Sequence, residues 1–395
     1  MWGAFIRWGN RVFNAVGRWL LNRGWLQVPL EPSDILARAQ TRTGLPDSSH
    51  FPYPDALEVA CASLDQDAQL SLTGRIVLRT HLTKAASTRL RLMDLERRHP
   101  RWFDAPLNDP LIVVGLPRSG TTFLHRLLVE LDGARGLATW EIRDPIPPDG
   151  PDRRRSRGVA AVRFLRTLVP EVDRKHYLDP DAAEECVGLF DPCFWTPTLW
   201  RFAACHRYLE WYQAQDPTEG YRTYRKLLQV FQAQDPKRRL VLKLPNHLGF
   251  IDTLSSVIPE ARMIQTHRDP VPVIGSYNSL MCSVQRMGAE RQDLHRAGQA
   301  GLDMWAWHHI RSSAARPQVP AGRMVDVQYE DLRAHPLSEV ETALEELGIG
   351  LADTERDRLR VLVGQRTQHA HGRHVYSLAD YGLTDEEVRS AFSSA

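Results

Sequence analysis

The stretch Leu111 to Leu128, LIVVGLPRSGTTFLHRLL, constrains the fold more than any other part of the 395-residue chain. It begins with a short run of aliphatic residues, which is typical of a strand buried on both faces of a parallel sheet. Gly115 and Gly120 then bracket a loop, and the residues from Thr121 onward predict a helix. Such a strand, loop and helix form an anion site, because main-chain N–H groups and the helix dipole favour negative charge.

The loop differs at one position from the nucleotide-triphosphatase pattern G-x-x-x-x-G-K-[ST]. Thr121 stands where that pattern has lysine, and the cation of the loop is Arg118, three residues upstream. We also find no apolar strand ending in an aspartate that would hold Mg²⁺ beside the loop. The sequence therefore predicts an anion site without the magnesium chemistry of ATP hydrolysis. A tight glycine-rich turn without a ligand is the alternative.

Three later stretches also predict strands, namely residues 239–245, 261–267 and 323–332. Helical patterns lie between them, and strands that alternate with helices form a parallel sheet. We therefore expect an α/β fold with a P-loop-like central parallel sheet flanked by helices and a helical N-terminal extension. Ligands of such sheets bind at the carboxyl ends of the strands, where the motifs of this sequence lie.

Two regions are expected along the chain. Residues 1–105 predict a helical N-terminal extension, and residues 106–395 predict the α/β domain, with a helical insertion at about 150–235. The insertion is rich in aromatic residues. Most of them are expected in the core, and some are candidates for the wall of an apolar ligand pocket.

Residues 1–30 predict a basic amphipathic helix. Arginine and asparagine recur on one face at helical spacing, large apolar residues occupy the other, and no acidic residue precedes Glu31. A basic, tryptophan-rich helix of this kind can lie in a membrane interface. The preferred interpretation is that its apolar face packs onto the main body.

The composition excludes several classes of protein. The net charge of +2 gives no signal for nucleic-acid binding. Five cysteines without a C-x-x-C pair predict reduced thiols and neither a disulfide framework nor a zinc site. No apolar run approaches the length of a membrane span, and no signal peptide is visible. We therefore expect a cytoplasmic protein without a bound metal.

A second anion-binding pair follows the strand expected at residues 261–267. Arg268 lies at the end of that strand, and Ser276 lies eight residues later, about two turns into the next helical segment. A guanidinium and a hydroxyl are suitable partners for a phosphate. The alternative is that Arg268 pairs with Asp269 or Glu260 on the surface.

With these motifs the sequence resembles a known family, the PAPS-dependent sulfotransferases, where PAPS is 3′-phosphoadenosine 5′-phosphosulfate. The resemblance is closest to the bacterial branch, which carries VVGLPRSGTT, LK-x-P-x-HL and THRDP in this order. It covers residues 111–330, with a weaker match near the C-terminus. It implies sulfonate transfer from PAPS to the hydroxyl of an acceptor, and the aromatic insertion suggests an apolar small molecule or a lipid.

The resemblance also implies roles for individual residues. Arg118 replaces the nucleotide-triphosphatase lysine, and the implied ligands of the 5′-phosphate and sulfonate are Arg118, Ser119, Gly120, Thr121 and Thr122. Arg268 and Ser276 match the arginine and serine that bind the 3′-phosphate, and Tyr329 matches a tyrosine near the adenine. The late Arg-Lys-Gly motif of the cytosolic branch has no clear equivalent here, and the candidates to replace it are Arg366, Arg373 and His374.

The implied reaction is an in-line attack of the acceptor oxygen on sulfur, with adenosine 3′,5′-bisphosphate as the leaving group. Arg118 and Lys243 are expected to stabilise the charge that develops on the bridging oxygen. The attacking hydroxyl also needs a general base. Glu141 is the first candidate and His247 the second, and the remaining candidates are His176, Glu184 and Glu185.

Two other functions remain open at this stage. A nucleotide kinase on the same fold is one, although the loop lacks the lysine and the sequence lacks a magnesium-binding aspartate. A peripheral-membrane binding protein that docks through residues 1–30 is the other, and it is compatible with an enzyme that acts on lipophilic alcohols.

Overall fold

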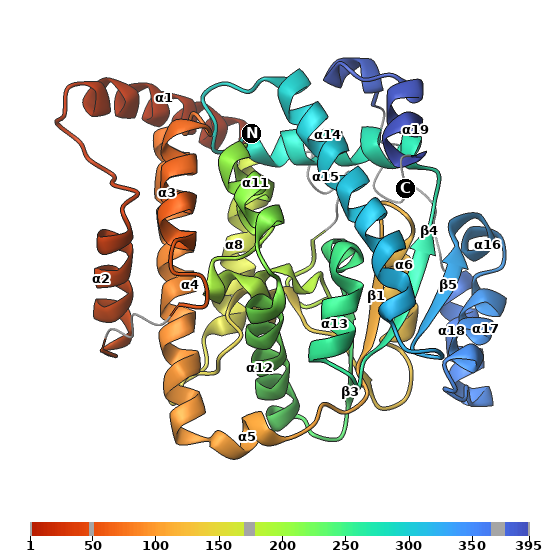
Figure 1. Ribbon diagram of the computed structural model, residues 1–395. Coiled ribbons are helices and arrows are strands. Elements are labelled where there is room, and N and C mark those ends of the chain that lie inside the picture. The colour runs from red at the N-terminus through yellow and green to blue at the C-terminus, as the bar shows by residue number, and fades with distance from the viewer. Residues whose placement is uncertain (1, 47–50, 170–177, 365–375, 394–395) are drawn as a thin grey trace.

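The computed structural model describes residues 2–46, 51–169, 178–364 and 376–393, with side chains from residue 9 onward (Figure 1). Five parallel strands form one sheet in the order β2-β3-β1-β4-β5. Their bounds are β1 Leu111–Gly115, β2 Ala134–Arg135, β3 Arg239–Lys243, β4 Arg262–His267 and β5 Met324–Gln328. The expected central parallel sheet flanked by helices is confirmed.

Strand β1 lies at the centre of this sheet and explains the aliphatic run of the sequence. Ile112 and Val114 pack into the hydrophobic core on one face of the sheet, and Leu111 and Val113 pack into the core on the other. All four are buried because helices cover both faces. The chain leaves β1 for β2 and β3 on one side and then returns to β4 on the other. This switch in direction opens a crevice at the carboxyl end of β1, which is the usual ligand site of such sheets.

Five helices precede the first strand of the sheet, and buried residues of α2, α3 and α4 contribute to the larger core. They are α1 Trp2–Asn22, α2 Pro32–Thr43, α3 Ala56–Gln66, α4 Leu72–Arg98 and α5 Pro100–Asp104. The segment between β1 and β3 contains α6 Thr121–Leu128, α7 Thr139–Arg143, α8 Arg154–Leu168, the 3₁₀ helix η1 Cys186–Cys193, α10 Thr198–Phe202, α11 His206–Ala214 and α12 Thr218–Gln234. Buried residues of α2 to α4 share one core with this segment and with β1.

The remaining helices follow β3. They are η2 Pro245–Phe250, α13 Ile251–Val257, α14 Pro270–Gln285, α15 Leu294–Ala315, η3 Arg316–Gln318, α16 Tyr329–Ala334, α17 Pro336–Glu346, α18 Asp353–Gly364, η4 Leu378–Tyr381 and α19 Asp385–Ser393. Helices α16, α17 and α18 lie beside the β5 edge of the sheet (Figure 1).

One boundary differs from the expectations. The strand expected over residues 323–332 ends at Gln328, and α16 begins at once with Tyr329. The helical pattern after residue 245 forms the 3₁₀ turn η2, followed by α13 from Ile251. Strand β2 was not expected, because two residues are too few to show a period along the chain.

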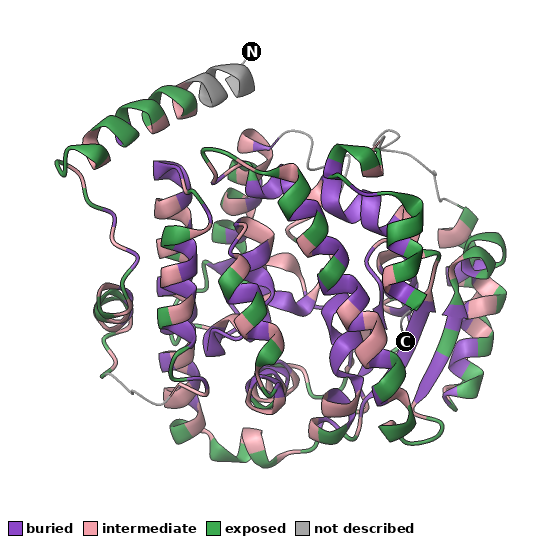
Figure 2. Ribbon diagram, turned by 45° about the horizontal axis from the view of Figure 1, so that its top comes forward, coloured by how far each residue is buried: buried purple, intermediate pink, exposed green. Residues whose placement is uncertain are grey.

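The aromatic residues of the insertion are mainly core residues, as expected. The rings of Phe190 and Tyr224 are stacked with their centroids 4.8 Å apart, and those of Trp195 and Tyr212 lie 4.6 Å apart. All four side chains are buried. Figure 2 shows this buried interior between α4 and the sheet.

Helix α1 packs in the opposite sense to the preferred interpretation. Its polar face meets the main body: Asn14 Oδ1 accepts a hydrogen bond of 2.9 Å from the Thr73 amide, and the Thr73 hydroxyl donates to Asn10 at 2.6 Å. Much of the described part of α1 is exposed, as the green ribbon of this helix shows (Figure 2). The exposed apolar residues are Val12, Phe13, Val16, Trp19 and, just beyond the helix, Trp25. The interpretation that the apolar face packs onto the body is therefore wrong.

No helix within the described residues combines the length and the apolarity that crossing a bilayer requires.

Candidate active site

The loop after β1 has an unusual backbone at three residues. Gly115 and Gly120 have φ angles of 135° and 86°, which glycine adopts without strain. A Cβ atom on Gly115 would lie 2.4 Å from Oγ1 of Thr266 on β4, so the loop also depends on this close approach. Arg118 has a φ of 65°, although it is not glycine. A positive φ is unfavourable for a residue with a side chain, and such backbone strain often occurs at functional sites. The strained backbone of Arg118 therefore suggests that the direction of its side chain is important for function.

The threonines and the serine of the loop point in different directions. Ser119 is fully buried, and its hydroxyl donates to the Leu116 carbonyl at 2.5 Å and lies 2.5 Å from the Thr266 hydroxyl. Thr121 and Thr122 border a large cavity instead. The Ser119 hydroxyl is therefore committed to holding the loop on β4, whereas the first turn of α6 faces the cavity.

Arg118 and Arg268 meet at the carboxyl ends of β1 and β4. Nη1 of Arg268 donates a hydrogen bond of 2.5 Å to the main-chain carbonyl of Arg118, and Nε of Arg118 donates one of 3.1 Å to the hydroxyl of Ser276 on α14. Burial, followed by the neighbouring Arg268, lowers the pKa of Arg118. Two adjacent guanidinium groups of this kind are stabilised by a bound anion.

The carboxylates proposed as partners of Arg268 are engaged elsewhere. Asp269 pairs with Arg389 at 3.2 Å, and Glu260 pairs with Arg225 at 2.8 Å. Within the described part of the chain, neither Arg118 nor Arg268 forms an ion pair with a carboxylate. The alternative of a surface ion pair for Arg268 is therefore wrong, and the arginine pair is free to bind a ligand.

Tyr329, the first residue of α16, lies beside this arginine pair. The guanidinium of Arg268 lies 4.0 Å from the centre of the Tyr329 ring, which is cation–π geometry. The same ring contacts the loop, since a Cβ atom on Gly120 would lie 3.1 Å from it. The sheet thus brings together Arg118, Arg268, Ser276 and Tyr329, four residues that the resemblance assigned to one nucleotide site.

Lys243 at the end of β3 lies on the other side of the loop. Its side chain is fully buried, which excludes an exposed strand-end lysine. Its Nζ donates to the Thr122 hydroxyl at 3.2 Å and lies 2.9 Å from a carboxylate oxygen of Glu185. The other oxygen of Glu185 accepts a hydrogen bond from Arg201. Lys243 therefore connects the loop to a buried carboxylate.

A cavity of about 630 Å³ lies beside the loop and is lined mostly by apolar side chains. Arg118, Thr121, Thr122, Glu184, Glu185 and Arg201 form its polar end next to the loop. The apolar walls come from α4, α8, α10, α14 and α15, and they include Val77, Val162, Phe164, Trp200, Phe202, Leu280, Met281 and Met304. The arrangement suits a ligand with a long apolar body and one polar group at the loop.

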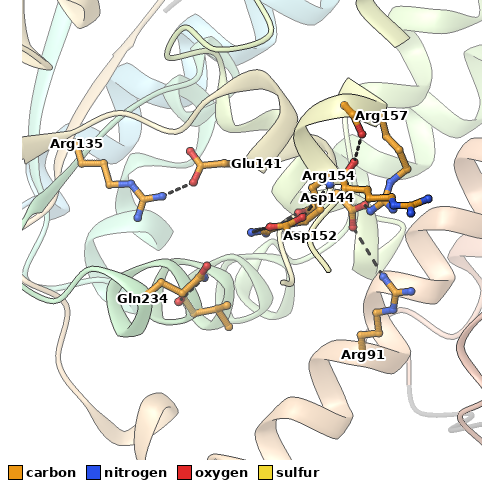
Figure 3. Close-up of polar contacts among 11 residues, drawn as sticks. Arg91, Arg135, Glu141, Asp144, Asp152, Arg154, Arg157 and Gln234 are labelled. Carbon is orange, nitrogen blue, oxygen red and sulfur yellow. Dashed lines mark hydrogen bonds and ion pairs between the residues drawn. The ribbon is translucent and has the colours of Figure 1, made fainter. Parts of the chain in front are cut away.

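Glu141, the first candidate for the general base, is held in place by its own segment. Its carboxylate pairs with Arg135 of β2 (Figure 3) and accepts a hydrogen bond of 2.9 Å from the Ala138 amide at the start of α7. Glu141 is buried and is not among the described residues that border the cavity. These contacts give Glu141 a structural role, because it caps the start of α7 and forms a buried ion pair with Arg135.

His247, the second candidate, is also enclosed in the core. Its Nδ1 lies 2.8 Å from the Tyr221 hydroxyl, and its Nε2 lies 3.6 Å from Sγ of Cys186. Burial lowers the pKa of His247 to about 3, so the ring is neutral at physiological pH. His247 lies inside η2 and is not among the described residues that border the cavity.

Glu184 and Glu185 both border the cavity next to the loop. Arg201, which holds Glu185, was not found from the sequence, because nothing distinguishes it from the many other arginines of this chain. The only feature of the sequence that pointed to Arg201 was its position among the aromatic residues of the insertion. The candidates His176, Arg366, Arg373 and His374 lie outside the described residues.

The similarity to known proteins agrees with this geometry. The model of the sulfotransferase family matches residues 110–353. The omega-hydroxy-beta-dihydromenaquinone-9 sulfotransferase Stf3 of Mycobacterium bovis and Mycobacterium tuberculosis is 25% identical over 295 residues, which are 71% of this chain and 73% of the relative.

Two solved structures share the fold over most of their length. Sulfotransferase STF1 from Mycobacterium tuberculosis H37Rv is 29% identical, with a TM-score of 0.77 over 92% of this chain and 99% of that one. Sulfotransferase STF9 from Mycobacterium avium is 26% identical, with a TM-score of 0.82 over 92% of this chain and 95% of that one.

Proposed function

The chain belongs to the sulfotransferase family, and from this premise we propose that it transfers the sulfonate of PAPS to the hydroxyl of an apolar, lipid-like acceptor. PAPS is supported as the donor mainly by the arginine pair Arg118 and Arg268. Neither arginine has a carboxylate partner in the described part of the chain. The kinase alternative is set aside, because the family is that of sulfotransferases and the loop lacks the lysine of the triphosphatases.

The residues beside the arginine pair suit the two ends of the donor. The loop amides, Arg118 and the first turn of α6 would hold the 5′-phosphosulfate, as helix N-termini hold phosphates. Arg268 and Ser276 would hold the 3′-phosphate, and the Tyr329 ring would contact the adenine. No side chain in this set is a carboxylate, the group through which proteins most often bind magnesium.

Donor and acceptor must be aligned at the polar end of the cavity. Bound PAPS supplies an activated sulfonate, and the acceptor oxygen forms the new S–O bond as the bridging S–O bond to the 5′-phosphate breaks. Arg118 and Lys243 would stabilise the negative charge on the departing phosphate oxygen. The acceptor proton passes to a general base.

For that base we propose the adjacent carboxylates Glu184 and Glu185. Both border the cavity, and Glu185 lies 2.9 Å from Lys243, which in turn contacts the loop. Glu141 and His247 remain candidates, but both are engaged in the core, and a general base must be within reach of the proton that it removes.

The acceptor class follows from the walls of the cavity. Apolar side chains from five helices surround a space of about 630 Å³, and polar groups gather at the loop. Stf3, a relative at 25% identity, is named for an omega-hydroxylated dihydromenaquinone. An acceptor with a terminal hydroxyl on a long apolar chain suits this cavity.

We propose the following division of labour along the chain. Residues 1–105 form the helical extension, and α4 supplies one wall of the cavity. Residues 106–395 form the sulfotransferase domain, and the insertion at about 150–235 supplies the opposite wall and the carboxylates. Extension and domain share one hydrophobic core, so they are expected to fold together.

A membrane surface is the second partner that we propose, and it rests on helix α1. Its exposed apolar face lies next to cations that include Arg11, Arg18 and Arg23. This combination favours an interface with anionic lipids. Helix α1 also contacts α8, whose exposed Phe164 borders the cavity. A lipid acceptor would then enter from the membrane side, and the expected cytoplasmic protein would be peripherally membrane-bound.

The proposed reaction is tested by incubating the protein with PAPS and long-chain primary alcohols in the presence of EDTA. Formation of the alkyl sulfate together with adenosine 3′,5′-bisphosphate, unchanged by EDTA, supports the proposal. Consumption of ATP, or dependence of the product on Mg²⁺, would overturn it.

A further inference from the structure

The acceptor cavity contains two cations that the proposed reaction does not use. Lys84 on α4 and Arg143 at the end of α7 both border it. Neither side chain forms a hydrogen bond or an ion pair within the described residues. By contrast, the nearby Arg91 and Arg157 both lie against the carboxylate of Asp144.

The neighbouring carboxylates form no ion pair with these cations within the described residues. Asp144 pairs with Arg157 at 2.6 Å and lies 3.9 Å from Arg91 (Figure 3). Asp191 accepts a hydrogen bond of 2.8 Å from Thr196 and lies 3.4 Å from Nε2 of His81, whose pKa is lowered by burial. Both carboxylates attract Lys84 and Arg143 through space, but neither contacts them directly.

Lys84 is partly buried, and its charge is disfavoured by its surroundings. Burial, followed by the charge of Arg143, lowers the pKa of Lys84 to about 7, and burial lowers the pKa of Arg143. Arg143 still has an exposed surface, as a side chain that projects into a wide cavity should. A second positive charge beside Lys84 is unfavourable without an anion, so the protein bears an electrostatic cost that a ligand would relieve.

The distance between the loop and the cations Lys84 and Arg143 determines how long such a ligand must be. The helix η1 leads from Glu185, at the transfer end, to Asp191 beside His81. A 3₁₀ helix rises about 2 Å per residue, so these ends lie roughly 12 Å apart. Apolar residues such as Ile142, Val187 and Leu165 border the same cavity.

We propose that Lys84 and Arg143 bind a carboxylate or phosphate of the acceptor. The acceptor is then an amphiphilic anion, with the hydroxyl to be sulfonated at the loop and the anionic group roughly 12 Å away across an apolar chain. The inference rests on the proposed sulfotransfer for the role of the hydroxyl, but anion binding can be measured without any turnover.

The test is calorimetric binding of ω-hydroxydodecanoate, its methyl ester and dodecyl phosphate to the protein saturated with adenosine 3′,5′-bisphosphate. The wild type should bind the two anions at least about tenfold more tightly than the ester, as charge-assisted hydrogen bonds predict. Lys84→Gln combined with Arg143→Gln should remove this preference and leave the affinity for the ester unchanged. Arg79→Gln, on α4 but not at the cavity, is the matched control and should keep the preference.

The following outcomes of the binding experiment overturn the inference. Equal binding of acid and ester by the wild type, or binding of none of the three, removes the anionic subsite. An equal loss for all ligands in the double variant indicates a structural role. A weaker affinity for adenosine 3′,5′-bisphosphate in that variant assigns the cations to the donor. An intact anion preference without any sulfonate transfer would sink the proposed function while the subsite stands.

Discussion

Nε of Arg118 donates a hydrogen bond of 3.1 Å to the hydroxyl of Ser276, 158 residues later in the chain. Arg268 lies against the same loop, with a hydrogen bond of 2.5 Å to the Arg118 carbonyl. Two segments that carry separate anion motifs thus form one site. Because strands β1 and β4 are neighbours, the motif after each strand reaches the same edge of the sheet.

The first prediction concerns nucleotide binding. Arg268→Ala should weaken binding of adenosine 3′,5′-bisphosphate by about 10- to 100-fold, since a hydrogen bond to a charged group contributes roughly 1.5–3 kcal/mol. Calorimetry without magnesium measures the loss. Arg333→Ala, at an exposed arginine of α16, is the control and should bind normally. Equal affinities of the two variants would remove Arg268 from the site.

The second prediction concerns the loop backbone. Gly115→Ala should lower the thermal midpoint and abolish tight nucleotide binding, because its Cβ would lie 2.4 Å from Thr266 Oγ1 at a φ of 135°. Gly322→Ala also has a positive φ, of 74°, but meets no atom within 4 Å. It should cost only about 1 kcal/mol of stability. If both variants unfold at the same temperature, strain rather than contact with β4 explains Gly115.

The third prediction identifies the general base. At least one of Glu184→Gln and Glu185→Gln should lower kcat about 100-fold, the usual contribution of general-base catalysis. The affinity for adenosine 3′,5′-bisphosphate should change little. Glu141→Gln is the matched control, because Glu141 pairs with Arg135 away from the cavity. A 100-fold loss in Glu141→Gln alone would return the role to that residue.

The fourth prediction concerns the membrane. Val16 on α1 and Val361 on α18 are exposed by 51% and 59%. Val16→Asp should reduce co-sedimentation with phosphatidylglycerol vesicles by about tenfold, because burying one such side chain contributes roughly 1.5–3 kcal/mol. Val361→Asp should have no effect. Binding that is insensitive to both substitutions, or absent in the wild type, would contradict a docking role of α1.

The fifth prediction concerns acid stability. Burial lowers the pKa of His247 and His308 to about 3 and that of His125 to about 4, below the unfolded value near 6.5. The unfolded chain therefore takes up protons first. The stability is fully present above pH 6.5 and falls as the pH drops toward the folded pKa values.

Each of these three histidines should lower the free energy of unfolding by about 2 kcal/mol between pH 7 and pH 5. Urea unfolding at the two pH values measures the loss. His308→Gln should reduce it by about one third, whereas His335→Gln, at an exposed histidine, should not. A loss of stability that is unchanged in His308→Gln would show that this group does not drive acid unfolding.

Local pattern was sufficient for much of the fold. The run before Gly115 is apolar on both faces, so it identified a central strand, and the strands at 239, 262 and 324 followed from the same argument. Strand β2 could not be predicted, since its two residues carry no periodic signal. The residues of the arginine site were also predictable, because their motifs follow predicted strands.

The sequence by itself thus determined the α/β class and the two anion motifs, because both depend on residues that are close together along the chain. Only the tertiary structure decided which carboxylates reach the cavity. Glu141 and Glu185 look alike in the sequence, yet one caps a helix and the other contacts Lys243. The structure also decided that α1 turns its apolar face outward. Both outcomes have the same physical reason. Each depends on which distant part of the chain the side chain contacts, and neither the amphipathic pattern nor the residue type specifies that contact.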